Sequence, residues 1–155
     1  MSGALDHVPS KIIRQLLFDL GHGTDPDDDA DWPIRYSFEP DEPANHITLF
    51  DTEPRQFGRS QPDGITQEHY GLQVRVRSET KQVGWRKAQD IAKSFDEDVL
   101  RDEVILGDYT YVVQSTNRQG GVRDLGVEAG TSRRRVHTMD ILTDIFLLEA
   151  VGTGL

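Results

Sequence analysis

An alternating stretch in the middle of the chain, HYGLQVRVRS, restricts the possible folds more than any other segment. Gln73, Arg75 and Arg77 share one face of this stretch. The opposite face is apolar and consists of Tyr70, Leu72, Val74 and Val76. A period of two is typical of a strand that is buried on one face and solvated on the other. We therefore expect a sheet whose core lies on one side.

Two segments have the periodicity of helices. Between Thr80 and Leu100, apolar residues recur every three or four positions and predict an amphipathic helix. Its expected buried stripe is Val83, Ala88, Ile91, Ala92, Phe95 and Val99. Near the N-terminus, PSKIIRQLLFDLGHG predicts another helix, with Ser10 as its N-cap and Gly21 as a left-handed C-cap. Its stripe is Ile12, Ile13, Leu16, Leu17 and Leu20.

Four further strands are predicted, at 32–40, 45–51, 109–116 and 133–150. One face of the last strand is shared by His137, Met139, Ile141, Thr143 and Ile145. Residues 52–64 are predicted to form a long loop because they contain two prolines and two glycines. Residues 118–133 are rich in glycine and are predicted to be loose.

This order of elements predicts an α+β fold: a mostly antiparallel sheet with two helices packed on one face. The 155 residues fit a single domain, 1–155, with the loose segment 118–133 and a long C-terminal strand. A GxGxxG motif, a P-loop and a βαβ alternation are all absent from the sequence, which argues against nucleotide-binding folds.

The charge and the lack of cysteine exclude several classes of function. The formal net charge is −10, so the average surface repels free duplex DNA. Without cysteine the chain has no disulfide, no thiolate zinc site and no cysteine nucleophile. The N-terminus lacks the pattern of a secretory signal, and no apolar run is long enough to span a membrane. We expect a protein that is made in a cytoplasm and does not enter a membrane.

An acidic run lies between the first helix and the first strand. It consists of Asp25, Asp27, Asp28, Asp29 and Asp31. As a calcium loop of the EF-hand type, it would need Gly at the sixth position and Glu at the twelfth, where the chain has Ala30 and Tyr36. We therefore expect a solvated acidic turn, with an electronegative functional surface as the alternative, and no metal ion. Neutralising these aspartates is expected to leave the fold intact.

Motifs for catalysis are absent. The five histidines fall in no HxH or HExxH arrangement, and no GxSxG is present. No nucleophile, base and orienting group can be assembled from the pattern. We expect no enzymatic activity and no cofactor. A small enzyme or a metal-binding module built on the acidic run stays the rival of another class, and calcium calorimetry would test it.

Two basic clusters interrupt the acidic sequence. Arg55 and Arg59 flank Phe57, and Arg133, Arg134 and Arg135 precede the last strand. In an acidic chain, such clusters complement acidic patches on another copy, and head-to-tail contacts of this kind close into rings. We treat these six residues as a candidate interface with a second subunit or another partner. Ordinary solvated arginines are the alternative.

The order of four segments resembles the tail terminator family of long-tailed bacteriophages, some of which are called minor capsid proteins. These segments are IIRQLLFDLGHGT, WPIRYSFEPDEPANHITLFDT, RQFGRSQPDG and HYGLQVRVRS with the helix that follows. The resemblance covers roughly residues 8–100; beyond them it rests on strand order.

The resemblance implies an α+β subunit of a ring, a hexamer in this family, located at the tail or neck of a virion assembled in the host cytoplasm. Such a ring caps the head-proximal end of the tail tube, stops tube polymerisation and joins the tail to head-completion proteins. The genome passes through the lumen, which the acidic run could line. Rivals in the same setting are a head-completion or connector protein on the portal side and a tail tube protein. Deleting residues 119–132 is expected to abolish capping and spare the fold.

Overall fold

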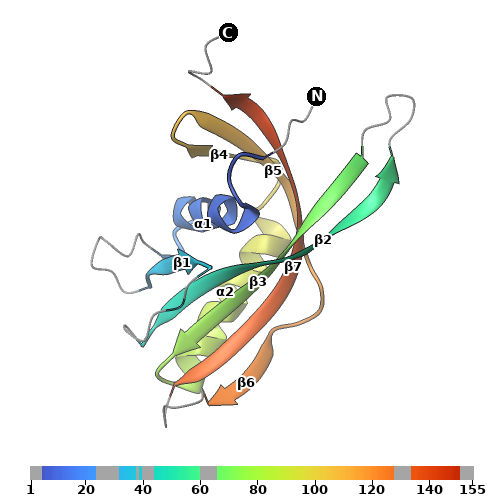
Figure 1. Ribbon diagram of the computed structural model, residues 1–155. Helices are drawn as coiled ribbons and strands as arrows, with labels where there is room; N and C mark the ends of the chain where they lie inside the picture. The colour runs from blue at the N-terminus through green and yellow to red at the C-terminus, as the bar shows by residue number, and fades with distance from the viewer. Residues whose placement is uncertain are drawn as a thin grey trace.

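The computed structural model describes residues 5–23, 32–37, 39, 44–59, 66–127 and 134–150; for 53–59, 66–68 and 127 it describes the backbone alone. Within these residues, two helices and seven strands follow one another (Figure 1). They are α1 (Pro9–Asp19), β1 (Ile34–Tyr36), β2 (His46–Arg59), β3 (Thr66–Ser78), α2 (Lys81–Glu97), β4 (Asp102–Leu106), β5 (Tyr109–Arg118), β6 (Arg123–Val127) and β7 (Arg135–Ala150).

All seven strands belong to one sheet. The order is β1-β2-β3-β7-β5-β4, and β6 pairs with the first part of β7. The pairs are antiparallel except β1–β2, which is parallel, with Ile34 opposite Ile47 and Tyr36 opposite Leu49. The predicted α+β fold with a mostly antiparallel sheet is therefore confirmed. Among the described strands, the parallel β1–β2 pair makes the sheet mostly rather than wholly antiparallel.

Both helices cover the same face of the sheet (Figure 1). The cross-strand partners Leu49, Val74 and Met139 are fully buried under them, as the alternation in HYGLQVRVRS requires. From α1, Ile12, Ile13, Leu16 and Leu17 enter the core, and from α2, Ala88, Ile91, Ala92 and Phe95. Burying one apolar side chain stabilises a fold by about 1.5–3 kcal/mol, so this one-sided core supplies most of the driving force.

The ends of the helices differ from the prediction in two places. α1 begins two residues earlier than expected, with Val8 as N-cap and Pro9 in the first turn, so Ser10 lies inside the helix. Pro is well suited to this place because its missing N–H would have no partner in the helix. In α2, Val83 is 44 % exposed rather than buried, because it lies in the first turn beside the sheet edge. Gly21 has the predicted left-handed conformation.

The predicted loop at 52–64 is wrong over much of its length. β2 continues through Arg59 and β3 begins at Thr66, and the two strands pair as a ribbon with Arg55 opposite His69 and Arg59 opposite Thr66. Two irregularities in register accommodate this extension. Proline and glycine are tolerated at such bulges, which explains why composition pointed to a loop.

Two strands were not predicted. β4 pairs with β5 across a two-residue turn at Gly107, whose φ of +59° suits such a hairpin. β6 lies within the segment predicted to be loose, and Asp124 pairs with His137 across a bulge. Deleting 119–132 would therefore remove a paired strand, so the expectation that this deletion spares the fold is revised. β5 runs to Arg118 and β7 starts at Arg135, which confirms the long C-terminal strand.

Candidate interaction surfaces

A two-stranded arm leaves the body of the molecule. It comprises residues 53–59 of β2 and 66–69 of β3, beyond the last β3–β7 pair at Tyr70 and Thr143. Figure 1 shows this ribbon projecting clear of both helices. The candidate interface residues Arg55, Phe57 and Arg59 lie on its β2 strand. The structure thus places this predicted cluster on a projecting element rather than in a loop.

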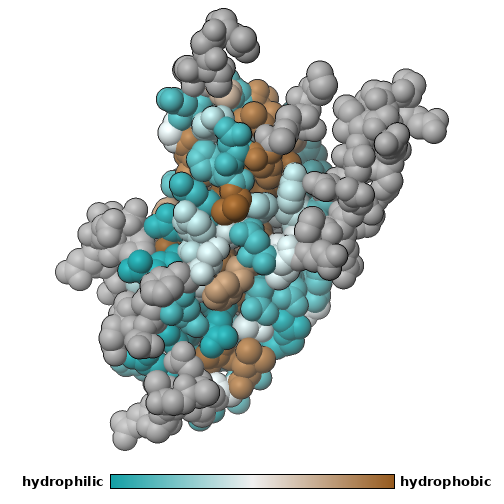
Figure 2. Space-filling view, viewed as in Figure 1, coloured by the Kyte–Doolittle hydropathy of each residue, from teal (hydrophilic) through white to brown (hydrophobic). Residues whose placement is uncertain are grey.

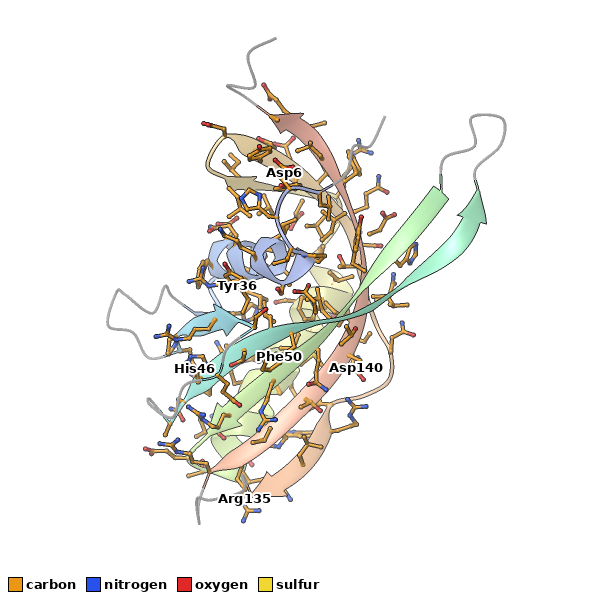
Figure 3. All side chains as sticks on the ribbon, in the orientation of Figure 1. Asp6, Tyr36, His46, Phe50, Arg135 and Asp140 are labelled. Carbon is orange, nitrogen blue, oxygen red and sulfur yellow. The ribbon has the colours of Figure 1, made fainter. Side chains whose placement is uncertain are left out.

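The second basic cluster lies at one end of the molecule. Arg135 is the first residue of β7 and pairs with Ser78 of β3 and with Val127 of β6. Figure 3 shows it beside β6, and Arg134 directly precedes it. Arg133 lies outside the described residues. The described arginines of this cluster are therefore far from the arm, and the structure does not bring the two predicted basic clusters together.

A shallow pocket of about 520 Å³ lies at the same end of the molecule, between the first turn of helix α2 and strand β6. Lys81, Gln82, Trp85 and Asp124 line it. Nζ of Lys81 is 3.3 Å from Oδ2 of Asp124, and Trp85 is 41 % exposed. The pocket thus combines an aromatic wall with an ion pair, which suits contact with a protein surface.

His137 lies behind the pocket. It is fully buried, it packs edge-on against Trp85 at 5.9 Å between ring centroids, and neither of its ring nitrogens has a hydrogen-bond partner. Burial lowers the pKa of His137, and nearby Lys81 lowers it further while Asp124 opposes the shift. The neutral ring therefore fills space under Trp85.

We call this end the basic end and define it as residues 79–86, 123–127 and 134–135. Its charged side chains are five basic and two acidic. The basic ones are Lys81, Arg86, Arg123, Arg134 and Arg135, and the acidic ones are Glu79 and Asp124. Besides Trp85, the basic end exposes Leu125, which is 55 % accessible. In a chain with a net charge of −10, this local excess of positive charge stands out.

The opposite end has the reverse character. We call it the acidic end and define it as residues 100–110 and 144–150, which form the β4–β5 hairpin and the end of β7. Arg101 is its one basic residue, against Asp102, Glu103, Asp108, Asp144 and Glu149. Leu100, Ile105 and Leu148 are 80, 64 and 50 % exposed. Ile105 pairs with Thr110, which pairs with Glu149, so Ile105 lies two strands away from the residue that follows Leu148.

A third cluster occupies the sheet face that the helices leave open, shown in Figure 2. Nε of Arg75 is 3.0 Å from Glu39, and buried Arg77 donates to the carbonyl of Ala44. His46 beside them is fully buried, and its Nδ1 lies 3.1 Å from Oγ1 of Thr48. Burial, and then the charges of Arg77 and Arg35, lower the pKa of His46 to about 4. This cluster links the ends of β2 and β3 to Glu39 and Ala44.

The acidic run Asp25, Asp27, Asp28, Asp29 and Asp31 lies outside the described residues, so its predicted role stays a prediction. Among the described residues, no three His, Asp or Glu side chains come together as metal ligands. Within the same part of the chain, neither helix has the length and apolar character needed to cross a membrane. No family model and no curated protein matches this sequence.

Sequence reasoning missed the acidic end and the pocket. Trp85 sits on the flank of the helical stripe, next to residues that are buried, so the helical period by itself does not single it out. The hairpin that exposes Ile105 had a local signal, the Gly107–Asp108 pair, which favours a two-residue turn. Ile105 and Leu148 belong to the same end of the molecule because β7 pairs with β5, and the sequence alone does not reveal this pairing.

Proposed function

We propose that this protein is a structural subunit of a ring that caps the head-proximal end of a phage tail tube. In this role it stops tube polymerisation and joins the tail to the head-completion complex. The β2–β3 arm is the observation that carries the proposal. A two-stranded ribbon without a third strand or a helix over it is at best marginally stable in water, so a projecting arm gains most of its stability from a partner.

Three further features support this assignment. The α+β architecture agrees with the resemblance in PDEPANHITLFDT and HYGLQVRVRS. The arm carries Arg55, Phe57 and Arg59, and aromatic and arginine side chains are enriched in protein interfaces. Six chains at −10 each give a ring of about −60, and an acidic lumen lets DNA slide through without sticking.

Purified tail tubes mixed with the protein test the proposal directly. Negative-stain images are expected to show one ring at one end of each tube, and tube growth is expected to stop. Tubes that stay bare while the protein binds purified portal complexes would favour the connector on the portal side. Long tubes formed by the protein alone would favour a tube protein.

An arm deletion provides the matched variant. Residues 53–70 are replaced by Asn-Gly, which joins Thr52 to its partner Gly71 through a tight turn. The deletion removes Tyr70, which is partly buried at the edge of the core, but the fully buried core residues lie outside it. The variant is therefore expected to keep its circular dichroism spectrum and a cooperative melt. Its ability to cap tubes is expected to be lost. A folded variant that still caps tubes would remove the arm from the proposal.

A further inference from the structure

The two ends of the molecule differ in both charge and position. The basic end carries five basic and two acidic side chains, and the acidic end carries five acidic and one basic. Strand β7 runs from one to the other, from Arg135 to Ala150, which separates them by roughly 50 Å. Figure 3 shows Arg135 at one extreme of the molecule and Asp6, close to β5, near the other.

Each end also exposes apolar side chains that its own fold does not cover. Trp85 and Leu125 are 41 and 55 % exposed at the basic end. Ile105 and Leu148 are 64 and 50 % exposed at the acidic end. Figure 2 shows hydrophobic surface over β6 at one extreme and around β4 and β5 at the other. Apolar anchors, Trp foremost, surrounded by complementary charge are the usual composition of a protein interface.

From these observations we infer that the basic end of one copy docks onto the acidic end of the next copy. This contact rests on the proposed function and deepens it, because it specifies how neighbouring subunits of the ring meet. Trp85 and Leu125 pack against Ile105 and Leu148 of the neighbour. Lys81 and Arg86 face Glu103 and Glu149 across the rim.

Charge and geometry favour this arrangement over its alternatives. A contact between two basic ends or two acidic ends would place like charges together, which costs free energy and slows encounter. Because the ends lie at opposite extremes of one rigid sheet, a single chain cannot satisfy the contact internally. A heterologous contact leaves one free basic end and one free acidic end on every open assembly, so it propagates, and it closes into a ring when the rotation between neighbours allows closure.

Two single-site variants test the contact. Trp85→Glu blocks the basic end, and Ile105→Lys blocks the acidic end; each adds one charge opposite to the excess at that end and removes an apolar anchor. Leu125→Glu serves as a second basic-end variant in case Trp85→Glu perturbs the packing on His137. Lys93→Glu is the matched control, because Lys93 is exposed on α2 and lies outside both ends. Circular dichroism and thermal melts establish that each variant folds.

Analytical ultracentrifugation of each variant alone and of equimolar mixtures gives the decisive readout. The wild type and Lys93→Glu are expected to form species larger than a dimer, and more salt is expected to weaken them. Trp85→Glu and Ile105→Lys are each expected to remain monomeric. Their mixture is expected to yield dimers and nothing larger, because one intact basic end and one intact acidic end remain.

Several outcomes would overturn the contact. The first is that the wild type stays monomeric both free and on tail tubes. The second is that the folded variants assemble like the wild type. The third is that the mixture of Trp85→Glu and Ile105→Lys stays monomeric. Rings that cap tubes despite all these variants would leave the proposed function standing and remove this contact. Mixed dimers together with bare tubes would support the contact and count against capping.

Discussion

Ser10 donates both its backbone N–H and its hydroxyl to the carboxylate of Asp51, at 2.9 and 2.5 Å. Ser10 lies in the first turn of α1, whose N-cap Val8 provides no side-chain hydrogen bond. The cap of this helix therefore comes from strand β2, 41 residues away in sequence. A carboxylate at a helix N-terminus also interacts favourably with the helix dipole. The contact ties α1 to β2 just before the arm begins.

Removing this carboxylate is expected to destabilise the fold. Asp51→Ala should lower the free energy of unfolding by about 1–2 kcal/mol, because it leaves two donors of Ser10 without their partner. Asp51→Asn should cost less, since one acceptor oxygen remains. Urea denaturation measures both. Asp19→Ala, at the other end of α1, is the control and should change stability little; a similar loss there would mean that the effect is not specific to the cap.

Gly84 allows the close approach of α2 to the sheet. A Cβ at this position would overlap Oγ of Ser78 and lie 3.0 Å from Nδ1 of His137. Gly84→Ala is therefore expected to lower the free energy of unfolding by about 1–3 kcal/mol, even though alanine favours helices. Chemical denaturation measures the loss, and Ser78→Gly in the same chain should recover part of it. Gly121→Ala meets open space and is expected to be nearly neutral. Equal losses at Gly84 and Gly121 would contradict the packing explanation.

The buried ring of His46 makes stability depend on pH. Its pKa is about 4 in the folded protein against 6.5 ordinarily, so the folded state favours the neutral ring. The resulting stability is complete above about pH 6.5 and declines as the pH falls toward 4, by at most about 3 kcal/mol. His22 and His137, whose pKa values are also lowered by burial, act in the same direction.

The contribution of His46 can be isolated by substitution. His46→Gln is expected to reduce the loss of stability between pH 6.5 and 4, as measured by urea midpoints across that window. NMR titration of the ring protons should show that His46 stays neutral until the pH approaches about 4. His69→Gln removes an imidazole from the arm and should keep the wild-type profile. A His46 ring that titrates near 6.5 would refute the assignment.

Asp96 and Arg118 link the end of α2 to the end of β5. Nη2 and Nε of Arg118 donate to the carboxylate at 2.7 and 3.0 Å, and these hydrogen bonds hold the pKa of Asp96 below its ordinary value. The pair therefore stabilises the fold above about pH 4 and loses its effect as the pH falls through the lowered pKa. The side chains are 41 and 28 % exposed, so Asp96→Asn should cost only about 0.5 kcal/mol at neutral pH. A loss above about 2 kcal/mol would show that the pair is more than a surface bridge. Thermal melts at several pH values measure it.

Much of the fold followed from periodicity. The alternation through Leu72, Val74 and Val76 located the central strand and its buried face, and the stripes of Ile13 with Leu17 and of Ile91 with Phe95 located the helices. These patterns are local because side-chain direction repeats every two residues in a strand and about every 3.6 in a helix. They determined the α+β class and the one-sided core before any pairing was known.

Only the tertiary structure decided the rest, because it depends on which distant residues meet. Asp51 rather than Ser10 caps α1, since strand β2 passes that helix end. Residues 53–59 form a strand because β3 pairs with them, although Pro54 and Gly58 favour a loop. The basic and acidic ends arise because β7 spans the sheet and gathers charges from segments far apart in sequence. The charge of each residue can be read from the sequence, whereas a charged surface forms only when long-range strand pairing brings distant residues together.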